Sequence, residues 1–158
     1  MERYQDMDTN HRDATRGVLA CAFDVHARLG PGLLESTYRT CMVHRLERDG
    51  FLVEREVPIT INFDGALIGT AYRADVVVER KILLELKAVE SLLSIHLAQL
   101  RTYLEHSHLP VGLLLNFNVK SLKDGIRRLE MDPRQHATTL SNSPAVLPPT
   151  PPNSLFPS

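Results

Sequence analysis

Two short apolar segments in the middle of the chain constrain its fold more than any other feature. Residues 73–79 and 82–87 are rich in Val, Ile and Leu at both odd and even positions. Successive side chains of a strand point to opposite faces, so this pattern is typical of central strands covered on both faces. We therefore expect a mixed central sheet that is flanked by helices.

The surrounding sequence predicts four helices and four further strands. Apolar residues recur at helical spacing from His11 to Leu29, and Gly30-Pro31-Gly32 ends that helix. Beyond Gly50, β-branched and alternating residues indicate strands, with a turn at Asp64-Gly65. The predicted helices cover residues 11–29, 31–50, 94–105 and 123–129, and the strands cover residues 51–56, 59–63, 66–68, 73–79, 82–87 and 111–117. This order, ααβββββαβα, is that of an α/β fold around one sheet.

The composition divides the chain into one domain and a tail. Every Asp, Glu, Lys and Arg lies at or before Arg134, whereas residues 135–158 carry none of them and contain six prolines. The length suits one domain, residues 1–134, whose core needs no disulfide or structural metal. Uncharged, proline-rich segments do not pack into helices or sheets, so we expect residues 135–158 to form a disordered tail.

The formal net charge of −1 and the distribution of apolar residues exclude several classes of protein. Domains that coat nucleic acid by bulk electrostatics usually have a pI above about 9, so any nucleic-acid contact here must be local. The polar first twelve residues do not resemble a secretory signal, and no apolar run approaches the roughly 20 residues that span a bilayer. With two cysteines, Cys21 and Cys41, we expect a cytoplasmic protein without disulfides or membrane association.

Three charged residues, Asp75, Glu85 and Lys87, lie inside the apolar strands. Burying a charge there is costly unless the charge is paired or binds a metal ion. Glu85 and Lys87 share a face because side chains alternate with a period of two. A three-residue loop over residues 79–81 would place Asp75 opposite Glu85 on that face, whereas a two-residue loop would send Asp75 to the other side. The functional interpretation therefore predicts a loop of odd length or a bulge.

Two explanations of this charge cluster are open on spacing alone. Opposed carboxylates on neighbouring strands have Cβ atoms about 5 Å apart and repel each other unless a cation lies between them. Mg²⁺, or Mn²⁺ in its place, would resolve the repulsion and keep several waters, one of which can attack a phosphodiester while Lys87 orients it. In the alternative, Lys87 forms a structural ion pair with Asp75 or Glu85.

Asp75, nine intervening residues and Glu85-Leu86-Lys87 together resemble the D…(D/E)-x-K core of the PD-(D/E)XK nuclease superfamily, with Ala74 where the name-giving proline would be. Residues 32–38, Gly-Leu-Leu-Glu-Ser-Thr-Tyr, resemble the signature of the small GxxExxY proteins, a branch of that superfamily. The resemblance covers residues 12–130 in several ordered blocks. It implies a PD-(D/E)XK nuclease-like sheet and a metal-dependent nuclease that hydrolyses phosphodiester bonds.

The resemblance also implies roles for individual residues. Asp75 and Glu85 would ligate the metal ion, joined by Glu35 and by the backbone carbonyl of Leu86. Lys87 would assist the attacking water. Without the resemblance, Glu35 is explained simply as an acid in the first turn of a helix, where it interacts favourably with the helix dipole.

Four further residues are candidates around this site. Gln99 and Tyr103 share a helical face and resemble the Q-x-x-x-Y element of RecB-type and lambda-exonuclease-type nucleases, which contacts the nucleic-acid backbone or the catalytic lysine. Tyr38 lies on the same helical face as Glu35 and either supports the substrate site or packs. His26 is either an extra ligand, by similarity to RecB-type enzymes, or a partly buried, hydrogen-bonded histidine.

Arg127 belongs to the basic cluster of the chain, with Lys120, Lys123 and Arg128. This cluster either grips phosphates beside the metal site or forms a solvated helix face. The expected partner is a nucleic acid, with DNA favoured over RNA, and a homodimer would bring two sites to the two strands of a duplex. The alternative function is a non-catalytic nucleic-acid-binding or accessory module that retains the nuclease scaffold.

Overall fold

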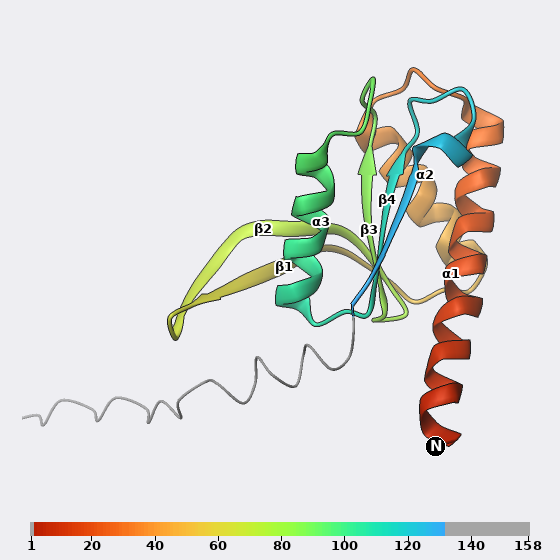
Figure 1. Cartoon of the computed structure of the whole chain (residues 1–158). Coiled ribbons are helices and arrows are strands. Elements are labelled where there is room, and N and C mark those ends of the chain that lie inside the picture. The colour runs from red at the N-terminus through yellow and green to blue at the C-terminus, as the bar shows by residue number, and fades with distance from the viewer. Residues whose placement is uncertain (1, 132–158) are drawn as a thin grey trace, which may run out of the picture.

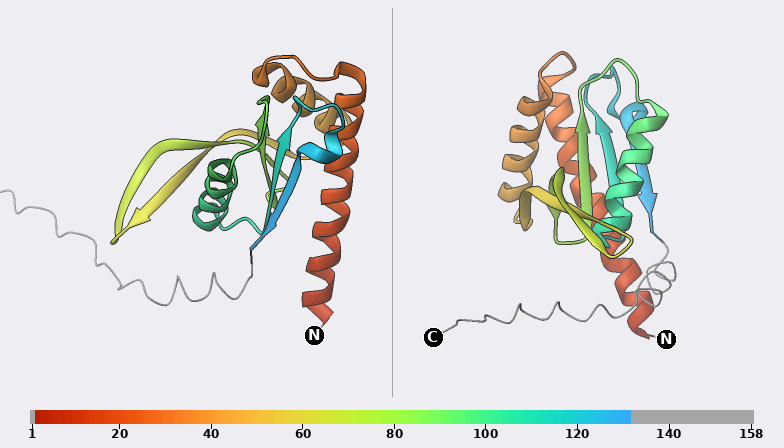
Figure 2. Two further views of the ribbon diagram at one scale, coloured as in Figure 1. Left: turned by 45° about the horizontal axis from the view of Figure 1, so that its top comes forward. Right: turned by 90° about the vertical axis from the view of Figure 1, so that its left-hand side faces the viewer.

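The computed structural model describes residues 2–131, and the side chains from Arg12 onward except those of Thr70 and Ala71. Five strands form one mixed sheet in the order β1-β2-β3-β4-β5, with helices on both faces (Figure 1, Figure 2). The predicted mixed α/β fold is thus confirmed. The predicted tail at residues 135–158 lies outside the described residues. Along residues 2–131, no helix is both long and apolar enough to cross a membrane.

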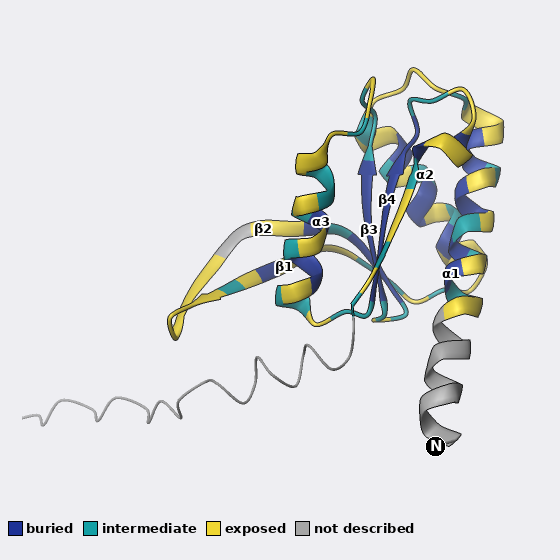
Figure 3. Ribbon diagram, in the orientation of Figure 1, coloured by how far each residue is buried: buried dark blue, intermediate teal, exposed yellow. Residues whose placement is uncertain are grey.

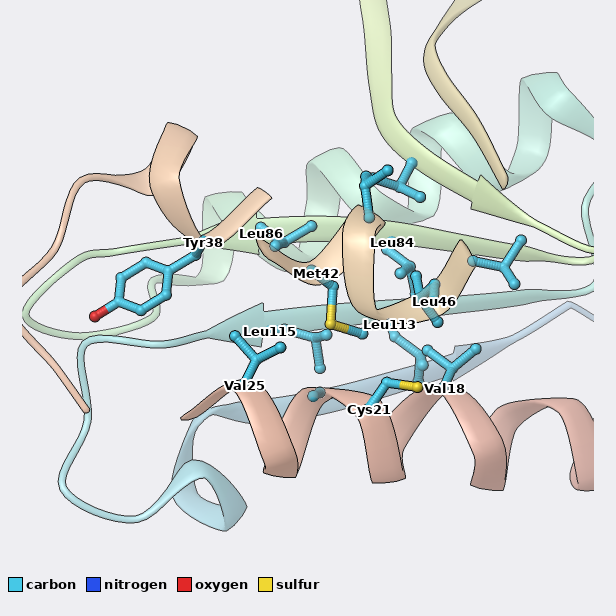
Figure 4. Close-up of a cluster of buried hydrophobic side chains, with 14 of the residues drawn as sticks. Val18, Cys21, Val25, Tyr38, Met42, Leu46, Leu84, Leu86, Leu113 and Leu115 are labelled. Carbon is cyan, nitrogen blue, oxygen red and sulfur yellow. The ribbon is translucent and has the colours of Figure 1, made fainter. Parts of the chain in front are cut away.

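Helices α1 (Glu2–Leu29) and α2 (Glu35–Arg48) cover one face of the sheet and enclose the larger core (Figure 4). Both helices bury side chains at the spacing that one helical face requires. The helix side chains at the centre of this core are Val18, Cys21, Ala22, Val25, Tyr38, Met42 and Leu46. The core fixes α2 against the sheet, so the first turn of α2 is held close to the ends of the central strands.

The turn between α1 and α2 is longer than the sequence pattern predicts. Gly30 and Gly32 take φ angles of 65° and 104°, which glycine adopts without a steric penalty. The predicted start of the second helix beside Pro31 is wrong: α2 begins at Glu35, because Leu34 still has extended backbone angles (φ −67°, ψ 147°). Glu35 is therefore the first residue of α2.

Strands β1 (Val53–Phe63) and β2 (Ala66–Val78) form one long hairpin, where four shorter strands are predicted. The predicted turn at Asp64-Gly65 is present, with φ angles of 51° and 78° as in a type I′ turn. Pro58 does not interrupt β1, because β1 is an edge strand, where a missing N–H can face away from the neighbouring strand. The far end of the hairpin extends from the sheet as an arm (Figure 1).

The two central strands are covered on both faces, as their composition predicts. β3 (Ile82–Lys87) and β4 (Val111–Asn116) run parallel, and every residue of the two strands except Lys87 is buried (Figure 3). Helix α3 (Ser94–Ser107) connects them and packs on the face opposite α1 and α2, over a second, smaller core. Charged side chains on β3 therefore lie in an apolar setting.

The last element is a strand, so the predicted helix over residues 123–129 is wrong. A single 3-10 turn, η1 (Leu122–Gly125), leads into β5 (Ile126–Glu130), which pairs antiparallel with β4. This pairing satisfies backbone groups along a buried strand that water does not reach. A Cβ on Gly125 would lie 2.3 Å from the Asn116 carbonyl oxygen, so glycine is required at the entry to β5. The observed order is ααβββαββ, with η1 before the last strand.

Candidate active site

The hairpin between β2 and β3 has the three-residue loop that the functional interpretation predicts. Val78 pairs with Ile82, so residues 79–81 form the loop. The same register places Asp75 opposite Glu85. The predicted odd loop length is confirmed, and it brings together two acids that are ten residues apart in the chain.

At this point the side chains of Asp75 and Glu85 accept hydrogen bonds from backbone N–H groups, in place of the backbone ladder. The Glu85 carboxylate accepts a bond from the Asp75 N–H (Oε1, 3.3 Å), and the Asp75 carboxylate accepts one from the Leu86 N–H (Oδ2, 2.9 Å). Among the described residues, backbone pairing between β2 and β3 covers only Val76–Val78 on the β2 side. Each acid therefore holds the neighbouring strand by a hydrogen bond, at the point where β2 separates from β3 and continues into the arm (Figure 1).

A bend in the β1–β2 hairpin accompanies this change. Glu56, which lies opposite Asp75, has a φ of 46°, outside the strand region. Ala74 and Val77 are three residues apart in β2, yet both pack into the smaller core, so the strict alternation of side chains breaks between them. Because of this bend, the Asp75 side chain reaches both β3 and helix α2.

Glu85 is a buried acid with few partners. Glu85 is 4% exposed, and its carboxylate forms no salt bridge with any residue from 12 to 131. Burial and, after it, the negative charge of Asp75 raise the pKa of Glu85, whereas the Asp75 N–H and the charge of Lys87 lower it; together they bring this pKa to about 8. At neutral pH the metal-free Glu85 carboxyl therefore holds a proton, which a bound cation would displace.

Arg39 links Glu35 to Asp75. Glu35 and Arg39 lie one turn apart on α2, and Arg39 Nη2 is 3.3 Å from Glu35 Oε1 and 3.0 Å from Asp75 Oδ1. The sequence motifs predict no role for Arg39. Its position four residues after Glu35 could have indicated the ion pair between them, since residues at i and i+4 share a helical face.

The residues at this site fit a divalent cation through two carboxylates. Nowhere in the described part of the chain do three His, Cys, Asp or Glu side chains lie close enough to hold an ion. Mg²⁺ commonly takes one or two protein carboxylates and keeps several waters, which Asp75 and Glu85 can satisfy. Because a buried carboxylate without a compensating cation is costly, Glu85 can be ionised at neutral pH only where a cation binds beside it. The predicted third acid, Glu35, joins the pair only through Arg39.

Lys87 lies at the end of β3 with its side chain half-buried. The Phe117 N–H donates to the Lys87 carbonyl (2.9 Å), which fixes the backbone at this position. The alternative of a structural ion pair between Lys87 and either acid is wrong: among the described residues, Asp75 pairs with Arg39, and Glu85 has no ion pair. The Lys87 charge still acts on Glu85, whose pKa it lowers.

Gln99 and Tyr103 lie one turn apart on α3, and Tyr103 packs in the smaller core. The Gln99 side-chain amide donates to the Tyr103 hydroxyl (2.8 Å), and the Tyr103 ring packs at 5.9 Å from the ring of Tyr72. Burial raises the pKa of Tyr103, and the charges of Glu85 and Asp75 raise it further. Tyr103, which Gln99 contacts, thus lies near enough to the two acids for their charges to act on its hydroxyl.

Tyr38 lies in the larger core instead, and His26 lies beside that core, with its ring 6.3 Å from the ring of Phe117. Tyr38 is fully buried; its hydroxyl donates to the Gly30 carbonyl, accepts from the Leu33 N–H (3.2 Å), and its ring stacks on Phe117 at 4.8 Å. His26 Nε2 lies 2.8 Å from the carbonyl oxygen of Val119. Tyr38 therefore packs in the core, which is the second of its two predicted alternatives. His26 is a buried, hydrogen-bonded histidine, which is also the second of its two alternatives.

Arg127 lies on β5 rather than on a helix, which corrects the predicted basic helix face. Its guanidinium donates to the carbonyl oxygens of Asp124 and Ile126 at 3.0 and 2.8 Å. Arg128 follows directly on the strand, so its side chain points to the opposite face, where it pairs with Glu130. The pairing of Arg127 with Leu114, and of Leu114 with Glu85, puts Arg127 in the same cross-strand row as Glu85.

Asn116 is a supporting residue for which the sequence motifs predict no role. It is 1% exposed; its amide donates to the Val89 carbonyl (2.9 Å) and accepts from the N–H groups of Val89 and Asn118 (3.1 and 3.2 Å). Because Lys87 and Val89 are close in the chain, Asn116 fixes the segment that leaves β3.

The sequence comparison decides the family. A family model described as the PD-(D/E)XK nuclease superfamily matches residues 12–129. The chain belongs to this superfamily. The match spans the acids on β2 and β3 and all of the elements that position them. No curated protein and no solved structure gives a match. Membership in the superfamily indicates a nuclease-like function and a nucleic-acid substrate, whereas membership in the GxxExxY branch stays a prediction.

Proposed function

We propose that the protein is a Mg²⁺-dependent nuclease of the GxxExxY branch that hydrolyses phosphodiester bonds in DNA. One observation carries the proposal: Asp75 and Glu85 meet across a three-residue hairpin loop, and within the described chain the buried Glu85 carboxylate has no cationic partner. Two opposed acids in an apolar setting, one of them unpaired, are the arrangement that a hard divalent cation stabilises.

The proposed metal ligands are Asp75, Glu85 and the backbone carbonyl of Leu86, with Glu35 joining them only once Arg39 no longer lies between Glu35 and Asp75. When bound, the cation would supply a Lewis acid and a water of lowered pKa. Mn²⁺ would serve in place of Mg²⁺, since both ions prefer oxygen ligands. The hydrogen bond from the Leu86 N–H holds the Asp75 carboxylate in position for this role.

In this proposal Lys87 orients the attacking water. It shares a face of β3 with Glu85, and its ammonium would offset negative charge that develops on the phosphorane. Gln99 and Tyr103 would arrange the substrate strand over the site from α3, supported by their mutual hydrogen bond. Arg127, in the same cross-strand row as Glu85, would contact a backbone phosphate.

The test is a panel of end-labelled DNA and RNA substrates, incubated with Mg²⁺, Mn²⁺ or chelator. Cleavage of DNA that requires the metal is expected, and Lys87→Ala should lower its rate at least about 100-fold. Lys81→Ala is the matched control, because Lys81 lies in the loop at the opposite end of β3 and should retain full activity. Undiminished cleavage by Lys87→Ala rejects the assignment. Metal-independent DNA binding without cleavage by the wild type would identify a non-catalytic module.

For duplex DNA the proposal includes a homodimer, because one small site acts on one strand at a time. Light scattering with and without duplex substrate measures the mass. A value near twice the 17.8 kDa of the chain supports the dimer, and a monomer bound to duplex contradicts it.

A further inference from the structure

We propose that Arg39 is an internal counter-cation of the candidate active site, and that its guanidinium must leave Asp75 before a divalent ion binds there. The inference rests on the metal site of the proposed function and adds to it a residue that the D…(D/E)-x-K pattern does not include. Arg39 would set the affinity of the site for its metal by competing with the metal for one carboxylate oxygen.

The competition follows from how the two oxygens of Asp75 are used. Oδ2 accepts the Leu86 N–H at 2.9 Å, and this bond belongs to the hairpin itself. Oδ1 is therefore the oxygen from which Asp75 can ligate a cation, and Arg39 Nη2 lies 3.0 Å from it. A guanidinium and a metal ion cannot both occupy that position.

The contacts of Arg39 are those of a removable cation. A single nitrogen, Nη2, serves both Glu35 and Asp75, at 3.3 and 3.0 Å. Arg39 Nε is buried and has no hydrogen-bond partner among the described residues. A structural arginine commonly engages its acids through two parallel N–H bonds, which Arg39 does not do. Its side chain is 29% exposed, so the guanidinium has a route to solvent.

A second arginine on the same helix shows the contrast and supplies the control. Arg45 binds Asp24 through Nε at 2.8 Å and Asp49 through Nη1. Arg45 therefore holds two acids with two different nitrogens, away from β3. Removing Arg45 also deletes one positive charge from α2, but the acids that this charge pairs with are Asp24 and Asp49, not Asp75 or Glu85.

Calorimetric titration of the full-length metal-free protein with Mn²⁺ tests the inference. Arg39→Met removes the charge while keeping an apolar stem of similar length, and it should bind Mn²⁺ about tenfold more tightly than the wild type. Arg39→Lys keeps a charge without the planar fork and should lie between the two. Arg45→Met should leave the affinity unchanged. Circular dichroism checks that each variant is folded, and Arg39→Gln replaces Arg39→Met if the latter does not fold.

The outcomes separate this inference from the proposed function. Mn²⁺ binding by the wild type with equal or weaker binding by Arg39→Met overturns the role of Arg39 and leaves the metal site standing. Absence of binding by both proteins overturns the metal site and the role of Arg39 together. Binding by Arg39→Met alone supports both, with Arg39 as a strong competitor. Tighter binding by Arg45→Met as well would reduce the effect to net charge and overturn the specific role of Arg39.

Discussion

Two clusters of acids and arginine lie against helix α2, and they differ in how completely the acids are paired. Towards the end of the helix, Arg45 binds Asp24 and Asp49, Arg28 also binds Asp24 (3.0 Å), and the Cys21 thiol donates to Asp49 (3.3 Å). Hydrogen bonds from Arg45 lower the pKa of Asp24 and of Asp49. Every acid of this cluster has a cationic partner, so we call it the structural cluster.

The cluster at the start of α2 is incomplete by the same measure. Arg39 shares one nitrogen between Glu35 and Asp75, and among the described residues Glu85 has no cation at all. The pKa of Glu85 is raised to about 8, mainly by burial. Hydrogen bonds from a cation lower the pKa of the paired acids, whereas burial without a cationic partner raises the pKa of Glu85. Pairing with a cation, more than composition, therefore separates the two clusters.

The largest expected effect is a loss of DNA cleavage, when one acid is neutralised in the incomplete cluster and the result is compared with the same change in the structural cluster. Asp75→Asn should lower DNA cleavage at least about 100-fold while the circular dichroism spectrum is retained, because Asp75 is a proposed metal ligand. Asp49→Asn should retain cleavage and lower the melting temperature, because Arg45 loses an acid. Equal loss of cleavage in the two variants would contradict the distinction between the clusters.

A pH effect on stability should come next in size. Glu85 has a raised pKa in the folded state, so the native metal-free protein binds more protons than the unfolded chain, and stability falls as pH rises from the ordinary pKa of Glu to about 8. Between pH 6 and 9 the loss should be about 2–3 kcal/mol, measured by urea unfolding with chelator present.

Glu85→Gln is the control for this pH effect, because it removes the ionisable group and should flatten the dependence above pH 6. The structural cluster predicts the opposite sign: Asp24 and Asp49 have lowered pKa values, so their contribution is lost as pH falls through those values. A Glu85→Gln protein that retains the alkaline loss would show that another group causes it.

A smaller effect is expected at the turn that leads into the incomplete cluster. Tyr38→Phe removes the hydrogen bonds to the Gly30 carbonyl and from the Leu33 N–H, and should reduce the free energy of unfolding by about 1–2 kcal/mol. Tyr72→Phe, at an exposed position, should leave stability unchanged. If Tyr38→Phe retained stability but lost cleavage, its hydroxyl would belong to the substrate site.

The pairing of Asp75 with Glu85 could be predicted from the sequence because it depends on a local count. The number of residues between two apolar runs fixes the parity of the hairpin loop, and parity fixes the face on which a side chain lies. The role of Arg39 could not be predicted in this way. Helical spacing predicts the contact of Arg39 with Glu35. The contact with Asp75 depends on the bend at Glu56, which lies opposite Asp75 and lets its side chain approach α2.

The error at residues 123–129 has a different physical origin. The local pattern of Lys and Arg suited a solvated helix, yet the segment forms a strand because β4 needs a hydrogen-bonding neighbour on its outer edge. The contacts of Asn116 with Val89 arise from the same long-range packing, since 27 residues separate them. Neither requirement is visible within a short window of sequence.

The most direct test of the metal site is the anomalous diffraction of a crystal soaked in Mn²⁺. The account predicts a manganese peak within bonding distance of a carboxylate oxygen of Asp75 and one of Glu85, with the Arg39 guanidinium displaced from Asp75. The absence of a peak there, or a peak at Asp24 and Asp49 instead, would contradict the assignment.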